Sequence, residues 1–390
     1  MIAGGPGVSA DRGTSATRRI DAPDATAGAA QETLAQWLLH GPAQVRSGPH
    51  AGAVAGTIDR SGEATYAYPE ITGYYLQWLA WRAATHGATK ELALRAEAAQ
   101  RWLARWLNDP AAPAATRIAL VTRADDWRNG ALFFFDLAMV LRGLGTAARA
   151  ALIVPDRAIV DGLCEKLQRL IAEDGQFDAC IAVRPDVALP QRWSTGRGGF
   201  LAKAAAGVLS AAAVIPEVAE SVRMAAARTF EASVRSAAAT PHDDVHALMY
   251  TFEGMVNRPD AEVRPLLPEM AMQFDGLLTE AQALGRIPES RRDGGAMERP
   301  ERVDVLAQTI RIGHLLGALC PDDPPDRVGI ARLSQTLVAS IRPEGSVPFA
   351  LPGEPASCNV WAAMFAEQAL GFSARRDGAP GVADLCRLLV

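Results

Sequence analysis

Lysine is scarce in this chain of 390 residues. The sequence has only Lys90, Lys166 and Lys203, so arginine carries nearly all of its positive charge. In total, the sequence has 39 basic and 44 acidic residues, which gives a formal net charge of −5. Proteins that bind nucleic acid through bulk electrostatic attraction have the opposite balance. We therefore expect no nucleic-acid partner.

Long apolar runs and paired cysteine motifs are also missing. No apolar run approaches the roughly 20 residues that a membrane-spanning helix requires. The five cysteines are scattered, odd in number and without CxxC spacing, which argues against a disulfide framework and a zinc knuckle. The first residues lack a basic start followed by an apolar stretch. These absences predict a cytoplasmic protein with reduced thiols and no membrane span.

Helix-forming residues dominate the rest of the chain. Residues 1–30 are rich in Gly, Ala, Ser, Thr and Asp without periodicity, and we expect a disordered tail there. Beyond them the pattern predicts an opening helix near 30–40, followed by helical pairs. The pairs are 70–86 with 90–107, 131–146 with 156–173, 199–213 with 216–237, 243–256 with 261–284, 301–319 with 326–342, and 358–371 with 379–390.

The two members of each pair differ in character. The first members are apolar nearly all round, as in ALFFFDLAMVLRGL, whereas the second members carry a charged stripe, as in KELALRAEAAQRWLARWL. Helices of the first kind are buried, and helices of the second kind face water. The pairs recur roughly every 55 residues, which is typical of a repeat architecture. We therefore predict one all-α domain over 31–390, an α/α toroid of six inner and six outer helices joined by short extended loops.

Polar motifs with aromatic residues precede the predicted inner helices. They are YAYPEITGY at 66–74, RADDWRNG at 123–130, LPQRWSTGRGGF at 189–200, TPHDDVH at 240–246, ERPERVD at 298–304 and PASCNVW at 355–361. In a closed ring, the N-terminal ends of the six inner helices converge on one mouth. We expect these motifs to line it together.

With this organisation the chain resembles the six-hairpin α/α-toroid superfamily of carbohydrate-active proteins, which includes glycoside hydrolases, polysaccharide lyases and sugar epimerases. The segments YPEITGY, RWSTGRGGFLAKAA and NVWAAMFAEQAL also resemble bacterial toroids associated with surface-polysaccharide biosynthesis. The resemblance implies a saccharide substrate and carries over no catalytic motif. A terpenoid-binding toroid is a rival of similar shape, but the sequence lacks a DxDD acid and a repeated QW motif, and only 6% of its residues are aromatic.

Two carboxylates are the first catalytic candidates. Glu70 lies among Tyr68, Tyr74 and other tyrosines, where it would act as general acid or base; an acid in a first helical turn is also ordinary helix-start chemistry. Asp136 interrupts an apolar inner helix and must face the cavity or pair with an arginine, for which Arg128 and Arg142 are the candidates.

A dense polar cluster follows in the third motif. Arg192, Trp193, Arg197 and Lys203 would form an anion site for a uronate, sulfate or phosphate, and a structural ion-pair network is the alternative.

His242 and His246 are four residues apart, a spacing that also suits zinc, but no third ligand is evident and we predict no metal and no cofactor. His246 is the better acid or base, with His242 as a sugar-binding side chain. Glu253 follows two turns deeper and is either a second catalytic acid or a core ion-pair partner.

The last two motifs add binding candidates. Arg302 and Asp304 open the fifth inner helix. Asn359 is a helix cap or a binding residue, and Trp361 stacks on a sugar face or packs in the core.

These residues predict an enzyme of hydrolase, lyase or epimerase type that acts on an anionic saccharide in polysaccharide biosynthesis or processing. The alternative is a non-catalytic glycan-binding or assembly protein. The sequence does not fix the oligomeric state.

Overall fold

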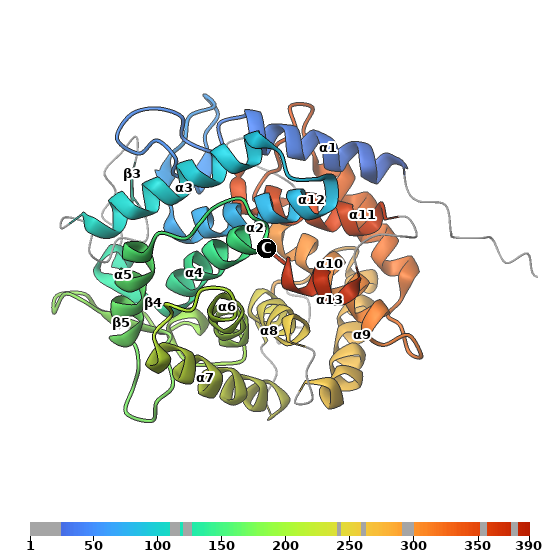
Figure 1. Cartoon of the computed structure of the whole chain (residues 1–390). Coiled ribbons are helices and arrows are strands. Elements are labelled where there is room, and N and C mark those ends of the chain that lie inside the picture. The colour runs from blue at the N-terminus through green and yellow to red at the C-terminus, as the bar shows by residue number, and fades with distance from the viewer. Residues whose placement is uncertain are drawn as a thin grey trace, which may run out of the picture.

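A computed structural model of the chain describes residues 25–109, 118–119, 127–239, 243–258, 263–290, 300–351, 357–375 and 381–390. Within these residues, two concentric rings of helices surround one axis (Figure 1). The fold is the α/α toroid that the sequence predicted. Helix α1 (Ala25–His40) begins inside the predicted tail, and residues 1–24 lie outside the described residues.

Apolar helices form the inner ring. They are α2 (Pro69–His86), α4 (Phe134–Arg149), α6 (Leu201–Ala212), α8 (Val245–Asn257), α10 (Val303–Leu319) and α12 (Val360–Ser373). Each packs on the next, and α12 packs back on α2, so the described ring is closed. In α4, every residue from Phe134 to Ala147 is buried, as expected for a helix with neighbours on all sides.

Amphipathic helices form the outer ring. They are α3 (Lys90–Asn108), α5 (Arg157–Gln168), α7 (Glu220–Ala239), α9 (Leu267–Leu284) and α11 (Arg327–Ser340), together with α1. In α3, only one face is buried, with Leu92, Ala96 and Leu103 among its residues. Helix α1 packs on α12 and α11 and fills the sixth outer position (Figure 1).

The predicted partner of the last inner helix is therefore wrong. We expected 358–371 to pair with 379–390, but α13 (Val382–Arg387) packs against α8 and α10 near the axis. Asn257, the last residue of α8, donates to the carbonyl oxygen of Cys386 at 2.7 Å. Helix α13 thus covers the C-terminal end of the inner ring, and the outer ring is completed by α1.

A buried carboxylate explains why α1 takes this place. Glu367 of α12 is fully buried and accepts hydrogen bonds from Gln31 of α1 at 2.9 Å and Arg82 of α2 at 3.1 Å. The indole nitrogens of Trp78 and Trp81 donate to its other oxygen at 3.0 and 2.9 Å. One side chain therefore ties three helices together, and all of its partners are in place.

Short antiparallel strand pairs fix the entry to several inner helices. The strands are β1 (Thr57–Ile58), β2 (Tyr66–Ala67), β3 (Ile118–Ala119), β4 (Ala131–Phe133), β5 (Cys180–Ala182), β6 (Glu301–Arg302), β7 (Ala350–Leu351) and β8 (Cys358–Asn359). They pair as β1–β8, β2–β3, β4–β5 and β6–β7. Strands β2, β4, β6 and β8 each precede an inner helix, so these pairs gather at one end of the ring. The remaining short elements are the 3₁₀ turns Trp127–Gly130, Trp193–Thr195 and Arg264–Leu266.

Two glycines allow α2 and α4 to approach closely. A Cβ atom at Gly73 would lie 2.5 Å from the carbonyl oxygen of Met139, and one at Gly143 would lie 2.4 Å from the carbonyl oxygen of Gly73. Backbone occupies both positions, so no larger residue fits without moving a helix. This close contact sets the spacing between the first turns of α2 and α4.

Candidate active site

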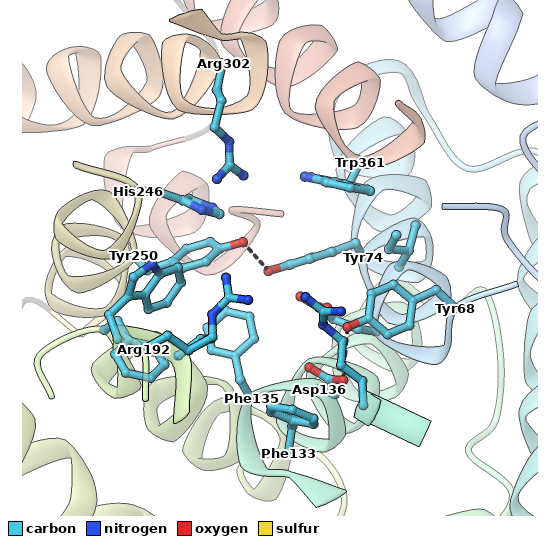
Figure 2. A pocket seen from close by; sticks show the side chains of 16 residues that line it. Tyr68, Tyr74, Phe133, Phe135, Asp136, Arg192, His246, Tyr250, Arg302 and Trp361 are labelled. Atoms are coloured by element: carbon cyan, nitrogen blue, oxygen red, sulfur yellow. Dashed lines mark hydrogen bonds between the residues drawn. The ribbon is translucent and has the colours of Figure 1, made fainter. Parts of the chain in front are cut away.

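A cavity of about 230 Å³ opens at the N-terminal ends of the inner helices. All six helices, or the residues just before them, contribute to it. Its lining is Tyr68, Glu70, Ile71, Tyr74, Arg128, Phe133, Phe135, Asp136, Arg192, Trp193, Ser194, Phe200, His246, Tyr250, Arg302 and Trp361 (Figure 2). The predicted convergence of the loop motifs on one mouth therefore holds for the described residues.

Two carboxyl groups occupy one side of the cavity. Glu70 lies in the first turn of α2 and Asp136 in the first turn of α4, where the glycine contact brings the two helices together. The hydroxyl of Tyr68 donates to Oδ2 of Asp136 at 3.2 Å. Arg128 also lines the cavity, and its positive charge acts on Asp136.

Burial makes both carboxyl groups weak acids. It raises the pKa of Glu70 to about 7, against the hydrogen bonds of Tyr68 and Tyr74 and the positive charge of Lys203. Burial also raises the pKa of Asp136 well above its ordinary value, and the negative charge of Glu70 raises it further. At neutral pH the pair therefore retains at least one proton.

Arg302 lies on the opposite side of the cavity (Figure 2), where it forms an ion pair with Asp304. Two nitrogens of Arg302 donate to the two oxygens of Asp304, at 3.1 and 2.6 Å. The indole nitrogen of Trp361 donates to Asp304 at 2.9 Å. Burial acts to raise the pKa of Asp304, but the charge and hydrogen bonds of Arg302 outweigh it and hold this pKa at about 2. Asp304 is fully buried and does not line the cavity, so it orients Arg302 and Trp361 rather than meeting a ligand.

His246 lies beside this ion pair, with its Nε2 3.9 Å from Oδ2 of Asp304. Its ring packs on Tyr250 at 4.3 Å between centroids, and the ring of Trp193 lies nearly perpendicular to it at 5.7 Å between centroids. Burial, followed by the charge of Arg302, holds the pKa of His246 well below its usual value. Neither ring nitrogen has a hydrogen-bond partner among the described residues. His246 is thus a neutral imidazole on the cavity wall.

The loop before α6 closes another part of the wall. Arg192 extends toward the middle of the cavity (Figure 2). The ring of Trp193 packs edge-to-face with that of Phe200, at 5.0 Å between centroids. Arg197, predicted to bind substrate, lies elsewhere. It is paired with Asp174 at 2.5 Å and Asp178 at 2.9 Å on the exposed surface. The prediction for Arg197 is therefore corrected to the alternative role, a structural ion pair.

Two tyrosines form the floor. The hydroxyls of Tyr74 and Tyr250 lie 3.5 Å apart (Figure 2). Lys203 and Glu253, which we expected at the site, are fully buried and are not part of the lining. They pair with each other at 2.7 Å, and Glu253 also accepts from Gln308 at 3.2 Å and from Arg311. Neither residue is therefore in the cavity, and both take the alternative role that the sequence left open, a structural ion pair.

The structure places the remaining candidates differently: one lines the cavity, two lie away from it, and one falls outside the described residues. Trp361 lines the cavity, whereas Asn359 caps α12 by accepting from the amide of Ala362 at 2.9 Å. Arg142, proposed as a partner of Asp136, is buried deeper along α4 and does not line the cavity. His242 lies outside the described residues.

The described part of the chain offers neither a cluster of metal ligands nor a membrane-spanning helix. It holds no group of three or more His, Cys, Asp or Glu side chains able to bind a metal ion. None of its helices is both long and apolar enough to cross a bilayer.

Sequence reasoning missed several lining residues. Tyr250 follows His246 by four residues, or one helical turn. This spacing places both side chains on the same helix face, so Tyr250 could have been predicted. Phe133 and Phe135 were assigned to the hydrophobic core, because a run of three phenylalanines contains no polar residue that would indicate a ligand-binding surface. Arg128 was considered only as a partner for Asp136, although it follows Trp127 directly in the second loop motif.

Several solved structures share this architecture. Cellobiose 2-epimerase from Spirochaeta thermophila superposes with a TM-score of 0.60 at 15% identity, covering 90% of this chain and 97% of that one. A D-mannose isomerase gives a TM-score of 0.62 at 12% identity over 89% and 96% of the two chains. An unsaturated glucuronyl hydrolase specific for heparin gives 0.55 at 13% identity over 90% and 96%. No family model matches the sequence, and no curated protein does.

At these identities the likeness shows the fold. It confirms the predicted resemblance to the six-hairpin α/α-toroid superfamily at the level of architecture. Fold alone does not fix chemistry, which has to be argued from the cavity.

Proposed function

We propose that this protein is a carbohydrate-active enzyme that carries out acid–base chemistry on an anionic saccharide. The observation that carries the proposal is the pair of the partly exposed Glu70 and the buried Asp136, two carboxyl groups with raised pKa values beside the hydroxyl of Tyr68. General acid–base catalysis requires groups that titrate near the working pH. The structural neighbours named above act on sugars or sugar derivatives, which supports a saccharide substrate.

The two carboxyl groups suit different roles in glycoside hydrolysis. Asp136 holds its proton more tightly because Glu70 adds its negative charge to the effect of burial. It would donate that proton to the glycosidic oxygen, while Glu70 as a carboxylate would activate water or attack the sugar. The tyrosine hydroxyls around them offer hydrogen bonds to sugar hydroxyls.

The opposite wall of the cavity supports an anionic substrate. Arg192 and Arg302 line the cavity together with the neutral His246, so this side attracts a carboxylate, sulfate or phosphate. The small volume of the cavity fits a short saccharide or the end of a chain, since it lies below the range of about 300–1,000 Å³ usual for small-molecule sites. Together with the resemblance at the sequence level, this supports a role in polysaccharide biosynthesis or processing.

A second candidate is proton transfer at the carbon beside a uronate, as in a lyase or an epimerase. It is favoured by His246, whose two ring nitrogens have no partner among the described residues and whose neutral form can accept a proton. Arg302 would then neutralise the uronate as its α-proton leaves.

The alternative to an enzyme is a non-catalytic glycan-binding protein. A terpenoid ligand is disfavoured by the charged lining.

The test is an assay of the protein on short uronic-acid-containing, sulfated and neutral saccharides. New reducing ends report hydrolysis, ultraviolet absorbance of an unsaturated product reports elimination, and nuclear magnetic resonance reports epimerisation. Glu70→Gln and Asp136→Asn should each reduce hydrolysis by about 10²-fold or more. Glu97→Gln, which changes an exposed carboxylate on α3, serves as the control. Saccharide binding without turnover, unchanged in both cavity variants, would establish the binding-protein alternative instead.

A further inference from the structure

A fully buried lysine lies directly beneath the floor of the cavity. Lys203 is in the first turn of α6, and its ammonium contacts Oε2 of Glu253 at 2.7 Å and a terminal carboxylate oxygen of Val390 at 3.1 Å. It also lies over three aromatic rings. The centroid distances are 4.6 Å to Tyr250, 4.8 Å to Tyr74 and 5.1 Å to Phe365.

Two of these rings belong to tyrosines whose hydroxyl groups reach the cavity. Tyr74 of α2 and Tyr250 of α8 bring their hydroxyls to within 3.5 Å of each other at the floor (Figure 2). An ammonium group over the faces of both rings is attracted to them because the face of an aromatic ring is negative. Lys203 therefore holds the two tyrosines from below, although it cannot touch a ligand.

Glu253, the ion-pair partner of Lys203, does not depend on Lys203 alone for a cationic partner. Glu253 already accepts from Arg311 and from Gln308, so it keeps a cationic partner without Lys203. The charged and titratable groups around the lysine are Glu70 and Tyr74 from α2, Arg142 from α4, His246, Tyr250 and Glu253 from α8, and Arg311 from α10. Lys203 is thus one of three cations in this region, with Arg142 and Arg311, and the carboxyl groups there are those of Glu70, Glu253 and the terminal residue Val390.

The effect on the cavity has a definite sign. The positive charge of Lys203 lowers the pKa of Glu70, against the larger effect of burial, and it also lowers the pKa of His246. Burial in turn lowers the pKa of Lys203 itself to about 7, while Glu253 opposes that shift. The lysine therefore titrates in the same range as the carboxyl group on which it acts.

We propose that Lys203 is a positioning residue: it fixes the Tyr74–Tyr250 floor, and its charge sets the fraction of Glu70 that is a carboxylate. This inference rests on the proposed role of Glu70 in acid–base chemistry. It predicts that neutralising Lys203 changes the protonation of a group in the cavity without removing any atom from the lining.

The first experiment needs no substrate. Glu70 is titrated by carbon-13 nuclear magnetic resonance of labelled glutamate, with its signal assigned from the Glu70→Gln variant. We expect the pKa of Glu70 to rise by about one unit in Lys203→Met, the shift typical of losing one nearby opposite charge. Gln308→Met is the matched control, because Gln308 is equally buried and also bonds Glu253 but has no charge. An unchanged pKa in folded Lys203→Met, or an equal rise in Gln308→Met, would overturn the inference.

A second variant protects the test against misfolding. Lys203→Met leaves Glu253 with one cation fewer, so the double variant Lys203→Met/Glu253→Gln removes both charges of the buried pair. The pKa of Glu70 should rise again relative to the single variant Glu253→Gln. Absence of that rise would also contradict the inference.

The pH profile of the reaction is the second readout. The limb that disappears in Glu70→Gln should move to higher pH in Lys203→Met, whether Glu70 acts as acid or as base, since its pKa rises in both cases. If the protein turns over no saccharide but the resonance of Glu70 shifts, the proposed function fails while the inference about Lys203 stands. If turnover occurs and the Glu70 limb stays in place, the inference about Lys203 fails alone.

Discussion

The hydroxyl of Tyr68 donates to Oδ2 of Asp136 at 3.2 Å. Tyr68 is the residue before α2, and Asp136 lies in the first turn of α4, so the bond joins two inner helices at the edge of the cavity. Because a hydrogen bond to the charged form favours it, this bond lowers the pKa of Asp136, against the larger effect of burial. Tyr68 therefore tunes the more weakly acidic member of the carboxyl pair.

Tyr68→Phe should raise the pKa of Asp136 and reduce kcat/KM by about tenfold, the value of one hydrogen bond to a charged group. The limb of the pH profile that belongs to Asp136 should move to higher pH. The measurement is kcat/KM across pH for the wild type and the variant. Tyr66→Phe is the control, because the Tyr66 ring packs on Tyr68 at 6.2 Å but does not line the cavity. Equal effects in both variants would show that packing, not the bond, is responsible.

Glu70→Gln should stabilise the protein while it reduces activity. Folding raises the pKa of Glu70 from 4.5 to about 7, so the ionised carboxyl destabilises the folded state above pH 7. At 1.36 kcal/mol per unit, reduced because Glu70 is partly exposed, the gain is about 1–3 kcal/mol. It should shrink as the pH falls below 7 and vanish below about pH 4.5, where both states are protonated. Urea unfolding at several pH values measures this gain, and a gain independent of pH would contradict the assignment.

Glu367→Gln should destabilise the protein without changing the cavity. The variant leaves Arg82, Trp78, Trp81 and Gln31 without a shared carboxylate, and loss of one partner from a buried ion pair costs about 3–5 kcal/mol. Chemical unfolding measures the loss, and saccharide binding below the transition should be normal. Glu32→Gln is the control, since Glu32 pairs with the same Arg82 but is half exposed. A loss of equal size in Glu32→Gln would mean that Arg82 alone, not Glu367, holds α1 in the ring.

Gly73→Ala should separate α2 from α4. Its Cβ would lie 2.5 Å from the carbonyl oxygen of Met139, so the helices must move apart, at a cost of about 1–3 kcal/mol. That movement also shifts Glu70 relative to Asp136, and we expect kcat to fall at least tenfold, which steady-state kinetics will show. The control is Gly28→Ala on α1, where the nearest atom lies at 3.8 Å and alanine fits. Full activity of Gly73→Ala would exclude a role for this close contact in positioning the carboxyl groups.

Arg192→Met should weaken the binding of anionic saccharides selectively. Arg192 extends into the cavity from an exposed loop, so its loss leaves the core intact. We expect KM for a charged saccharide to rise about tenfold, the value of one charge-assisted hydrogen bond, with kcat little changed. The KM for a neutral analogue should stay constant. Equal increases for both substrates would remove the support for an anionic substrate.

The positions of the helices were predictable because they depend on local periodicity. A helix that is apolar all round and a helix with a charged stripe are distinguishable from their own residues, as α4 and α3 show. The loop motifs before the inner helices were equally visible. Tyr68, Glu70, Asp136, His246 and Trp361 all come from them, or from the first turns that follow, and all line the cavity.

The depth at which each inward-facing side chain lies along the axis of the ring was not predictable. Lys203 and Glu253 occupy inward-facing positions like Glu70 and His246, and periodicity alone does not separate the layer that meets a ligand from the layer beneath it. The two layers differ through the relative stagger of neighbouring helices, which depends on contacts such as that between Gly73 and Met139. Those contacts are between residues far apart in the sequence.

The sequence by itself determined the alternation of buried and amphipathic helices, the toroid and the polar mouth, since each follows from residues close together in the chain. Tertiary structure decided that α1 rather than α13 completes the outer ring, through the bond from Gln31 to Glu367. It also decided that Glu70 and Asp136 line one cavity while Lys203 lies outside its lining, under the ring of Tyr74. Both outcomes depend on closing the ring, which brings α1 beside α12 and places side chains from six inner helices around one axis.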